Sequence, residues 1–285
     1  MALDVLTSTY YMDRDAKHVE EKPYELKFPA PEGFPATNTS WSRFDGIHVK
    51  DIRGQEADFT IAKNGFMVSE LKTSLAPTDF AESHKVEKVF LSEVAHHLKS
   101  TLKADRVLVF DYNLRISVPG FPISDGKPVE YQTPATIVHI DTTDAWTEHM
   151  HSLYKGSIPG IGQKPSYQYV NLWKPIKGPV KRWPLMLCDW NTYDVKKDII
   201  ARDLVYTDGQ LETYVGMHNP KHQYHYLSDQ LADEVWIMVQ SDSVHGKGMY
   251  NLETSKLPLT TDRRCTAHSV PKSAHDGFRS RARKH

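Results

Sequence analysis

Short strand-like runs between turn residues restrict the fold of this chain more than any other feature. Beyond residue 130, apolar, β-branched and aromatic residues gather at 136–143, 167–173 and 185–189, and the runs are separated by Gly- and Pro-rich stretches. Runs of about four to eight such residues with these boundaries are typical of β-strands. The strongest helical pattern, from Glu82 to Lys103, precedes them and carries apolar residues three and four positions apart. This order favours a β-rich sandwich or jelly roll with helices on its outside.

The same patterns predict the organisation of the rest of the chain. We expect one domain over residues 1–285, in which residues 1–80 form an irregular extension packed on the barrel and 81–285 a helical buttress plus the jelly-roll core. The irregular part follows from four prolines, which interrupt every candidate helix there. Further predictions are a strand at 106–111, a hairpin of 212–217 with 223–227, and a second helix from Ser228 through Met238.

Composition narrows the class of function. The 285 residues carry a formal net charge of −1, which gives no support for nucleic acid or an anionic membrane as partner. Two cysteines cannot form a disulfide framework, and we find neither a secretory signal nor a membrane-spanning stretch. We therefore expect a cytoplasmic protein in a reducing compartment.

His139 and Asp141 are the first candidate site residues. Side chains alternate along a strand, so the two project to the same face while Val138 and Ile140 project to the other. An imidazole and a carboxylate held in this way are two thirds of the 2-His-1-carboxylate triad that binds Fe(II). The chain has 15 histidines, so about one such pair is expected by chance. A strand histidine bonded to a neighbour is therefore the alternative.

A third ligand has to come from a distant part of the chain. A triad enzyme that uses 2-oxoglutarate also needs a cation for the cosubstrate's C5 carboxylate, and the planar fork of Arg suits it. His268 meets this requirement because Arg279 follows it, with Arg281 as the fallback. His218, His222 and His225 lie among aromatic residues, which favours a pocket lining or local hydrogen bonds. The remaining downstream candidates are His149, His151, His245, His275 and His285.

A longer pattern begins on the strand that carries Tyr169 and Asn171. Residues 169–180 read YVNLWKPIKGPV and residues 184–189 read PLMLCD, followed by shorter matches at 203–206, 212–214, 218–222, 226–229, 232–234 and 241–243. In this order they resemble the asaB hydroxylase/desaturase family, which includes a gibberellin desaturase and the CmcJ component of cephem methoxylation. The resemblance covers about residues 85–283.

The resemblance implies a non-haem Fe(II), 2-oxoglutarate-dependent oxygenase on a double-stranded β-helix. It implies His139, Asp141 and His268 as iron ligands and Arg279 as the partner of 2-oxoglutarate. The substrates would be O2 and a small apolar organic molecule, hydroxylated or desaturated in fungal secondary metabolism. Asn171 and Tyr169 share one strand face, where we expect cosubstrate contacts or ordinary packing.

Two alternatives belong to other classes of function. The chain could be a non-catalytic or accessory partner subunit, since members of such families work in pairs, and a homo- or heterodimer is expected on the same ground. The same ligands could instead hold Zn(II) in a metal-dependent hydrolase or isomerase, although the sequence has no general base placed by a motif such as HExxH.

Overall fold

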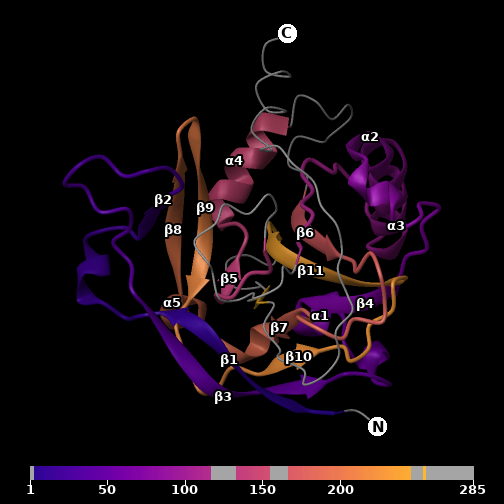
Figure 1. The fold of residues 1–285 in the computed structure, drawn as a ribbon, viewed down its shortest axis with the longest axis horizontal. Helices are drawn as coiled ribbons and strands as arrows, with labels where there is room; N and C mark the ends of the chain where they lie inside the picture. Colours follow the sequence, from indigo (N-terminus) through magenta and orange to yellow (C-terminus); the bar gives the residue numbers. More distant parts are fainter. Residues whose placement is uncertain (1–2, 117–132, 155–165, 245–252, 255–285) are drawn as a thin grey trace.

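Two β-sheets dominate the computed structural model, which describes residues 3–116, 133–154, 166–244 and 253–254 (Figure 1). The larger sheet has nine strands among these residues. In spatial order they are β1 (Val5–Met12), β3 (Trp41–Asp51), β10 (Tyr224–Tyr226), β7 (Met186–Cys188), β12 (Glu253–Thr254), β5 (His139–Ile140), β9 (Gly209–Gly216), β8 (Ile199–Tyr206) and β2 (Tyr24–Leu26).

The smaller sheet places β11 (Glu234–Asp242) between β4 (Phe66–Glu70) and β6 (Gln168–Trp173), with both pairings antiparallel. Short helical segments connect the strands or lie outside them. They are α1 (Ile61–Asn64), α2 (Ser83–Lys85), α3 (Leu91–Thr101), α4 (Asp144–Tyr154), α5 (Val195–Asp198) and 3-10 turns at Ala16–Val19, Glu56–Asp58, Asp79–Ala81 and Trp190–Thr192. Within the described residues, none of the helices is both long and apolar enough to cross a membrane.

The smaller sheet has its main core on the face that meets β7 of the larger sheet. Leu187 of β7 packs in one cluster with Phe66 of β4 and with Trp236 and Met238 of β11, and all four are buried. Burial of this apolar surface is the main favourable contribution to folding. The predicted class, mainly β with flanking helices, is therefore confirmed.

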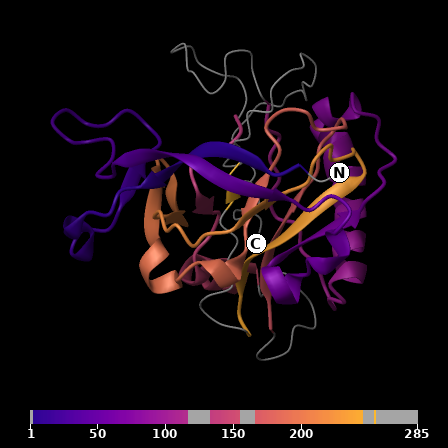
Figure 2. The same ribbon diagram turned by 90° about the horizontal axis from the view of Figure 1, so that it is seen from below.

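The predicted helix at Glu82–Lys103 is confirmed and covers the outer face of the smaller sheet (Figures 1 and 2). It runs from α2 through a π-helical turn (Val86–Phe90) into α3. Its apolar residues recur every four positions, and four residues turn an ideal α-helix about 40° beyond one full turn. Successive apolar side chains on such a helix therefore point in gradually changing directions. The wider π turn reduces this drift, so that Val94 and Leu98 still face Val235 and Ile237 of β11.

The prediction of a second helix from Ser228 to Met238 is wrong, because residues 234–242 form β11. This strand is buried on both faces. Val235 and Ile237 face α3, whereas Trp236 and Met238 face the main core. A strand covered on both sides is apolar at every position, so it lacks the alternation that distinguishes a strand from a buried helix.

The expectation of an irregular N-terminal segment is also wrong for much of its length. β1 and β3 pair antiparallel along almost their whole length at one edge of the larger sheet. The prolines that suggested irregular chain are confined to the connection between these strands, where only the three-residue β2 forms. That residues 1–285 make one domain remains a prediction.

Two further predictions about strands are wrong. Residues 106–111 do not form a strand. Val107 and Val109 pack on the cluster beneath α3, so the alternation of apolar and polar residues arises from packing next to a helix. The predicted partners 212–217 and 223–227 are strands of one sheet but do not pair with each other. β9 instead forms a hairpin with β8, while β10 pairs with β3 and β7.

Candidate metal centre

His139 and Asp141 converge at the end of the short strand β5. The imidazole Nε2 lies 3.3 Å from Asp141 Oδ1, and the His139 side chain is only 11% exposed. Only His139–Ile140 is a strand within the predicted run 136–143, yet it is held on both sides by β9 and β12. The backbone therefore fixes the imidazole, and the carboxylate reaches it from the turn that follows.

The hydrogen bond at the other ring nitrogen decides what His139 presents to Asp141. Nδ1 lies 3.0 Å from the Ile137 carbonyl oxygen, which can only accept, so Nδ1 carries the hydrogen. In the neutral ring, Nε2 then directs a lone pair toward a carboxylate oxygen. Two lone pairs that face each other at this distance repel. Only a second proton on the ring or a cation between the two atoms removes this repulsion. A histidine whose other N–H is tied to a carbonyl is the usual arrangement at a metal, so the pair fits a divalent metal ion.

Asp141 is fixed by two amide side chains. Asn171 of β6 donates from Nδ2 to Asp141 Oδ2 at 2.5 Å, and the Asp141 backbone N–H donates to Oε1 of Gln240 on β11 at 3.0 Å. For Asn171 the sequence predicts a cosubstrate contact or ordinary packing; the structure shows that its Nδ2 donates to the Asp141 carboxylate. Gln240 was not predicted, and its only sequence signal is one amide at the end of an apolar run.

The turn after Asp141 is tied into the start of α4. The Thr143 hydroxyl accepts from the Trp146 N–H at 3.0 Å and so caps the helix. Ser241 Oγ donates to Asp144 Oδ1 at 2.8 Å, which joins the same turn to β11. These contacts limit how far the Asp141 carboxylate can move from His139.

Tyr169, the second predicted cosubstrate contact, lies two positions from Asn171 on β6 and therefore on the same face. Its ring packs edge-on against Phe110, with 5.2 Å between the ring centroids, and Phe110 also meets Tyr154. The structure thus shows Tyr169 in an aromatic group on the strand face that also carries Asn171.

The predicted third iron ligand and the predicted partner of 2-oxoglutarate lie outside the described residues. His268, Arg279 and the fallback Arg281 all fall in 255–285. Among the residues that the structure describes, no group of three or more His, Cys, Asp or Glu side chains is arranged to hold a metal ion. A third ligand to the His139–Asp141 pair, as predicted, would therefore come from another part of the chain.

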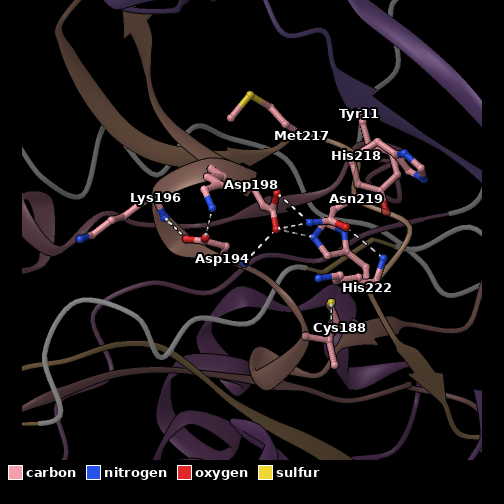
Figure 3. Close-up of polar contacts among 12 residues, drawn as sticks. Tyr11, Cys188, Asp194, Lys196, Asp198, Met217, His218, Asn219 and His222 are labelled. Carbon is pink, nitrogen blue, oxygen red and sulfur yellow. Dashed lines mark hydrogen bonds and ion pairs between the residues drawn. The ribbon is translucent and has the colours of Figure 1, made fainter.

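Two of the alternative histidines, His218 and His222, belong to a different polar cluster, built around Asp198 (Figure 3). His222 Nε2 lies 3.3 Å from Asp198 Oδ2, and both side chains are 1% exposed. Asn219 donates to the same carboxylate at 2.9 Å, and Arg14 reaches it from the chain after β1 at 3.1 Å. His218 stacks on Phe44. The prediction of local hydrogen bonds is thus confirmed for His222.

Burial and hydrogen bonding set the charge state of this cluster. Burial by itself would raise the pKa of Asp198, but hydrogen bonds from the Asp194 N–H, Asn219 and His222 outweigh it and hold the pKa below its ordinary value. Burial lowers the pKa of His222, and the nearby Asp198 offsets this only in part. The cluster is therefore a carboxylate surrounded by donors, with a neutral histidine among them.

Comparisons with known proteins agree with the fold. A family model described as YDMC, oxidoreductase/YMDC permease-like domain, matches residues 9–260. The chain is 28% identical over 211 residues to the alpha-ketoglutarate-dependent dioxygenase phiK of a fungal species, covering 71% of this chain and 72% of that protein. It is 26% identical over 215 residues to the hydroxylase/desaturase efuI of Hormonema carpetanum, covering 69% and 71%.

A solved structure adds the architecture. The iron and alpha-ketoglutarate-dependent endoperoxidase NvfI matches with a TM-score of 0.75 at 21% identity, over 92% of this chain and 94% of that one. This likeness confirms the double-stranded β-helix. The named relatives confirm the predicted resemblance to fungal hydroxylases and desaturases.

Proposed function

We propose that this chain, which belongs to the YDMC family (oxidoreductase/YMDC permease-like domain), is an Fe(II)- and 2-oxoglutarate-dependent dioxygenase. The observation that carries the proposal is the His139–Asp141 pair, in which Nε2 and a carboxylate oxygen face each other at 3.3 Å and Nδ1 is tied to a backbone carbonyl. Its relatives phiK and NvfI are named for the same cosubstrate. The substrate is a small organic molecule, hydroxylated or desaturated with O2, as in fungal secondary metabolism.

Each predicted site residue has a role in this proposal. His139, Asp141 and His268 hold the iron, and Arg279 pairs with the C5 carboxylate of 2-oxoglutarate. With its cosubstrate, the bound iron supplies oxidation of an unactivated C–H bond. Asn171 and Gln240 keep the carboxylate in place. Tyr169 and Phe110 provide apolar surface beside the pair, which suits an apolar substrate.

Anaerobic addition of Fe(II) and 2-oxoglutarate tests the proposal directly. We expect a visible charge-transfer band that requires both additions, followed by succinate release when air and a suitable substrate are supplied. A band without succinate under any substrate would favour the accessory-subunit alternative. Stoichiometric Zn(II) binding with no band would favour the hydrolase or isomerase alternative.

The remaining predictions concern the chain as a whole. We propose a single domain and a cytoplasmic location, and a homo- or heterodimer as the assembly. Sedimentation of the purified chain, alone and with candidate partners, tests the assembly. Limited proteolysis that yields one stable core would support the single domain, whereas two separable fragments would contradict it.

A further inference from the structure

Gln240 is a fully buried amide beside the proposed iron site, and only half of it has a partner. It is 0% exposed, and its Oε1 accepts from the Asp141 N–H at 3.0 Å. Its Nε2 is buried without a hydrogen-bond acceptor among the described residues. The assignment of the two amide atoms is not arbitrary, because an N–H can donate only to the oxygen.

The backbone around Gln240 is shaped to aim this side chain. The pairing of β11 with β6 shifts register between Val239 and Ser241, so Gln240 occupies a bulge. A bulge bends the strand and redirects a side chain, and bulges are common next to active sites. Contacts on both sides of the bulge join it to the metal centre. Ser241 donates a hydrogen bond to Asp144, and Met238 lies opposite Asn171 in the pairing of β11 with β6.

A buried donor without an acceptor loses its hydrogen bonds to water and gains none in return, and native proteins leave few such donors. Oε1 and Nε2 share one carbon atom, so the Nε2 donor lies beside Asp141. A 2-oxo acid presents only acceptor oxygens there, from its carboxylate and its keto group. Asn171, the other amide that holds Asp141, donates from Nδ2 to the Asp141 carboxylate.

We propose that Gln240 is a ligand-binding residue whose Nε2 donates to an oxygen at the 2-oxo acid end of bound 2-oxoglutarate, while its Oε1 holds the Asp141 backbone. This inference rests on the proposed function. It adds a contact on β11, separate from Arg279 at the opposite end of the cosubstrate.

Gln240→Met tests the proposal, because methionine has a similar length and shape and removes the donor. The matched control is Gln230→Met, since Gln230 is also 0% exposed and also uses one amide atom, donating to the Glu234 carbonyl. Binding of 2-oxoglutarate to the full-length chain is measured anaerobically by calorimetry at saturating Fe(II). Because Fe(II) is saturating, the dissociation constant measured for 2-oxoglutarate does not depend on any change in iron affinity.

We expect Gln240→Met to weaken 2-oxoglutarate binding about 10- to 100-fold, the effect of losing a hydrogen bond to a charged group. Gln230→Met should stay within about threefold of the wild type. Equal binding by the two variants would overturn the proposal, because the Nε2 acceptor would then lie within the protein. If Gln240→Met does not fold, Gln240→Asn keeps a buried amide that is too short for both contacts and should show the same loss. Absence of 2-oxoglutarate binding by the wild type would instead contradict the proposed function itself.

Discussion

At the scale of single residues, the placement of hydrogens on His139 determines what the site can bind. With Nδ1 tied to the Ile137 carbonyl, Nε2 is available as a ligand. We predict that His139→Ala abolishes Fe(II) binding and 2-oxoglutarate turnover. The measurement is anaerobic Fe(II) titration together with succinate release.

His222→Ala is the matched control for that experiment. His222 is also a buried histidine beside a carboxylate, but Asp198 belongs to the cluster of Figure 3. We expect this variant to lose stability and to retain Fe(II) binding in the folded fraction. If it lost Fe(II) binding while His268→Ala kept it, the assignment of the third ligand would be wrong.

Asn171 donates to Oδ2 of the proposed carboxylate ligand, the oxygen that does not face His139. Asn171→Leu keeps the size of the side chain and removes the donor that lies 2.5 Å from Asp141 Oδ2. Loss of such an outer contact typically weakens metal affinity about 10- to 100-fold, and we expect a change in this range by calorimetry. Tyr169→Phe, which keeps the ring that packs on Phe110, should leave iron affinity unchanged. A Leu variant with wild-type iron affinity would show that Asn171 does not position Asp141.

The sequence predicts two residues of this site, His139 and Asp141, but not all of the hydrogen bonds that hold them in place. His139 and Asp141 are two residues apart in the sequence, at the end of β5 and in the turn after it, so local geometry is enough to bring them together. Asn171 could be selected from its motif, but its contact with Asp141 could not. Gln240 is 99 residues from Asp141 in the sequence. Only the pairing of β11 with β6 brings it to the site, and no local pattern encodes that pairing.

At the scale of secondary-structure elements, β11 shows where sequence patterns become ambiguous. Its central residues contact α3 on one face and the main core on the other, so both faces are apolar. The helix at 82–103 was predictable because one of its faces remains in solvent and the apolar stripe stands out. Strands with one solvent face were predictable for the same reason, whereas their partners depend on long-range contacts.

The packing of α3 on β11 gives a prediction for this scale. Leu98 is 6% exposed and lies in the cluster with Val235 and Ile237. Leu98→Ala removes buried methyl groups and leaves a cavity, which costs about 2–5 kcal/mol. Urea unfolding should show this loss, while Lys99→Ala on the exposed side of the helix should change stability by less than about 0.5 kcal/mol. Equal effects of the two variants would mean that α3 does not pack on β11 as described.

At the scale of the whole molecule, several half-buried or buried histidines link stability to pH. Burial lowers the pKa of His97, His218, His222 and His225, and for His225 the pKa falls from 6.5 to about 4. His225 packs against both Phe59 and Phe66, with 4.9 Å and 5.9 Å between ring centroids. The folded chain therefore keeps these rings neutral at pH values where the unfolded chain protonates them.

The sign of the effect follows from proton binding. Below a pH of about 6.5 the unfolded chain binds a proton at residue 225 that the folded chain does not bind, so stability falls as the pH falls. The loss continues until the folded His225 titrates at about 4 and amounts to roughly 3 kcal/mol for this residue. His225→Phe cannot titrate, so it should lose less stability than the wild type between pH 7 and pH 4.5, as measured by urea unfolding at each pH. Parallel losses in the two proteins would show that the folded chain protonates His225 as readily as the unfolded chain does, and would contradict the lowered pKa of this residue.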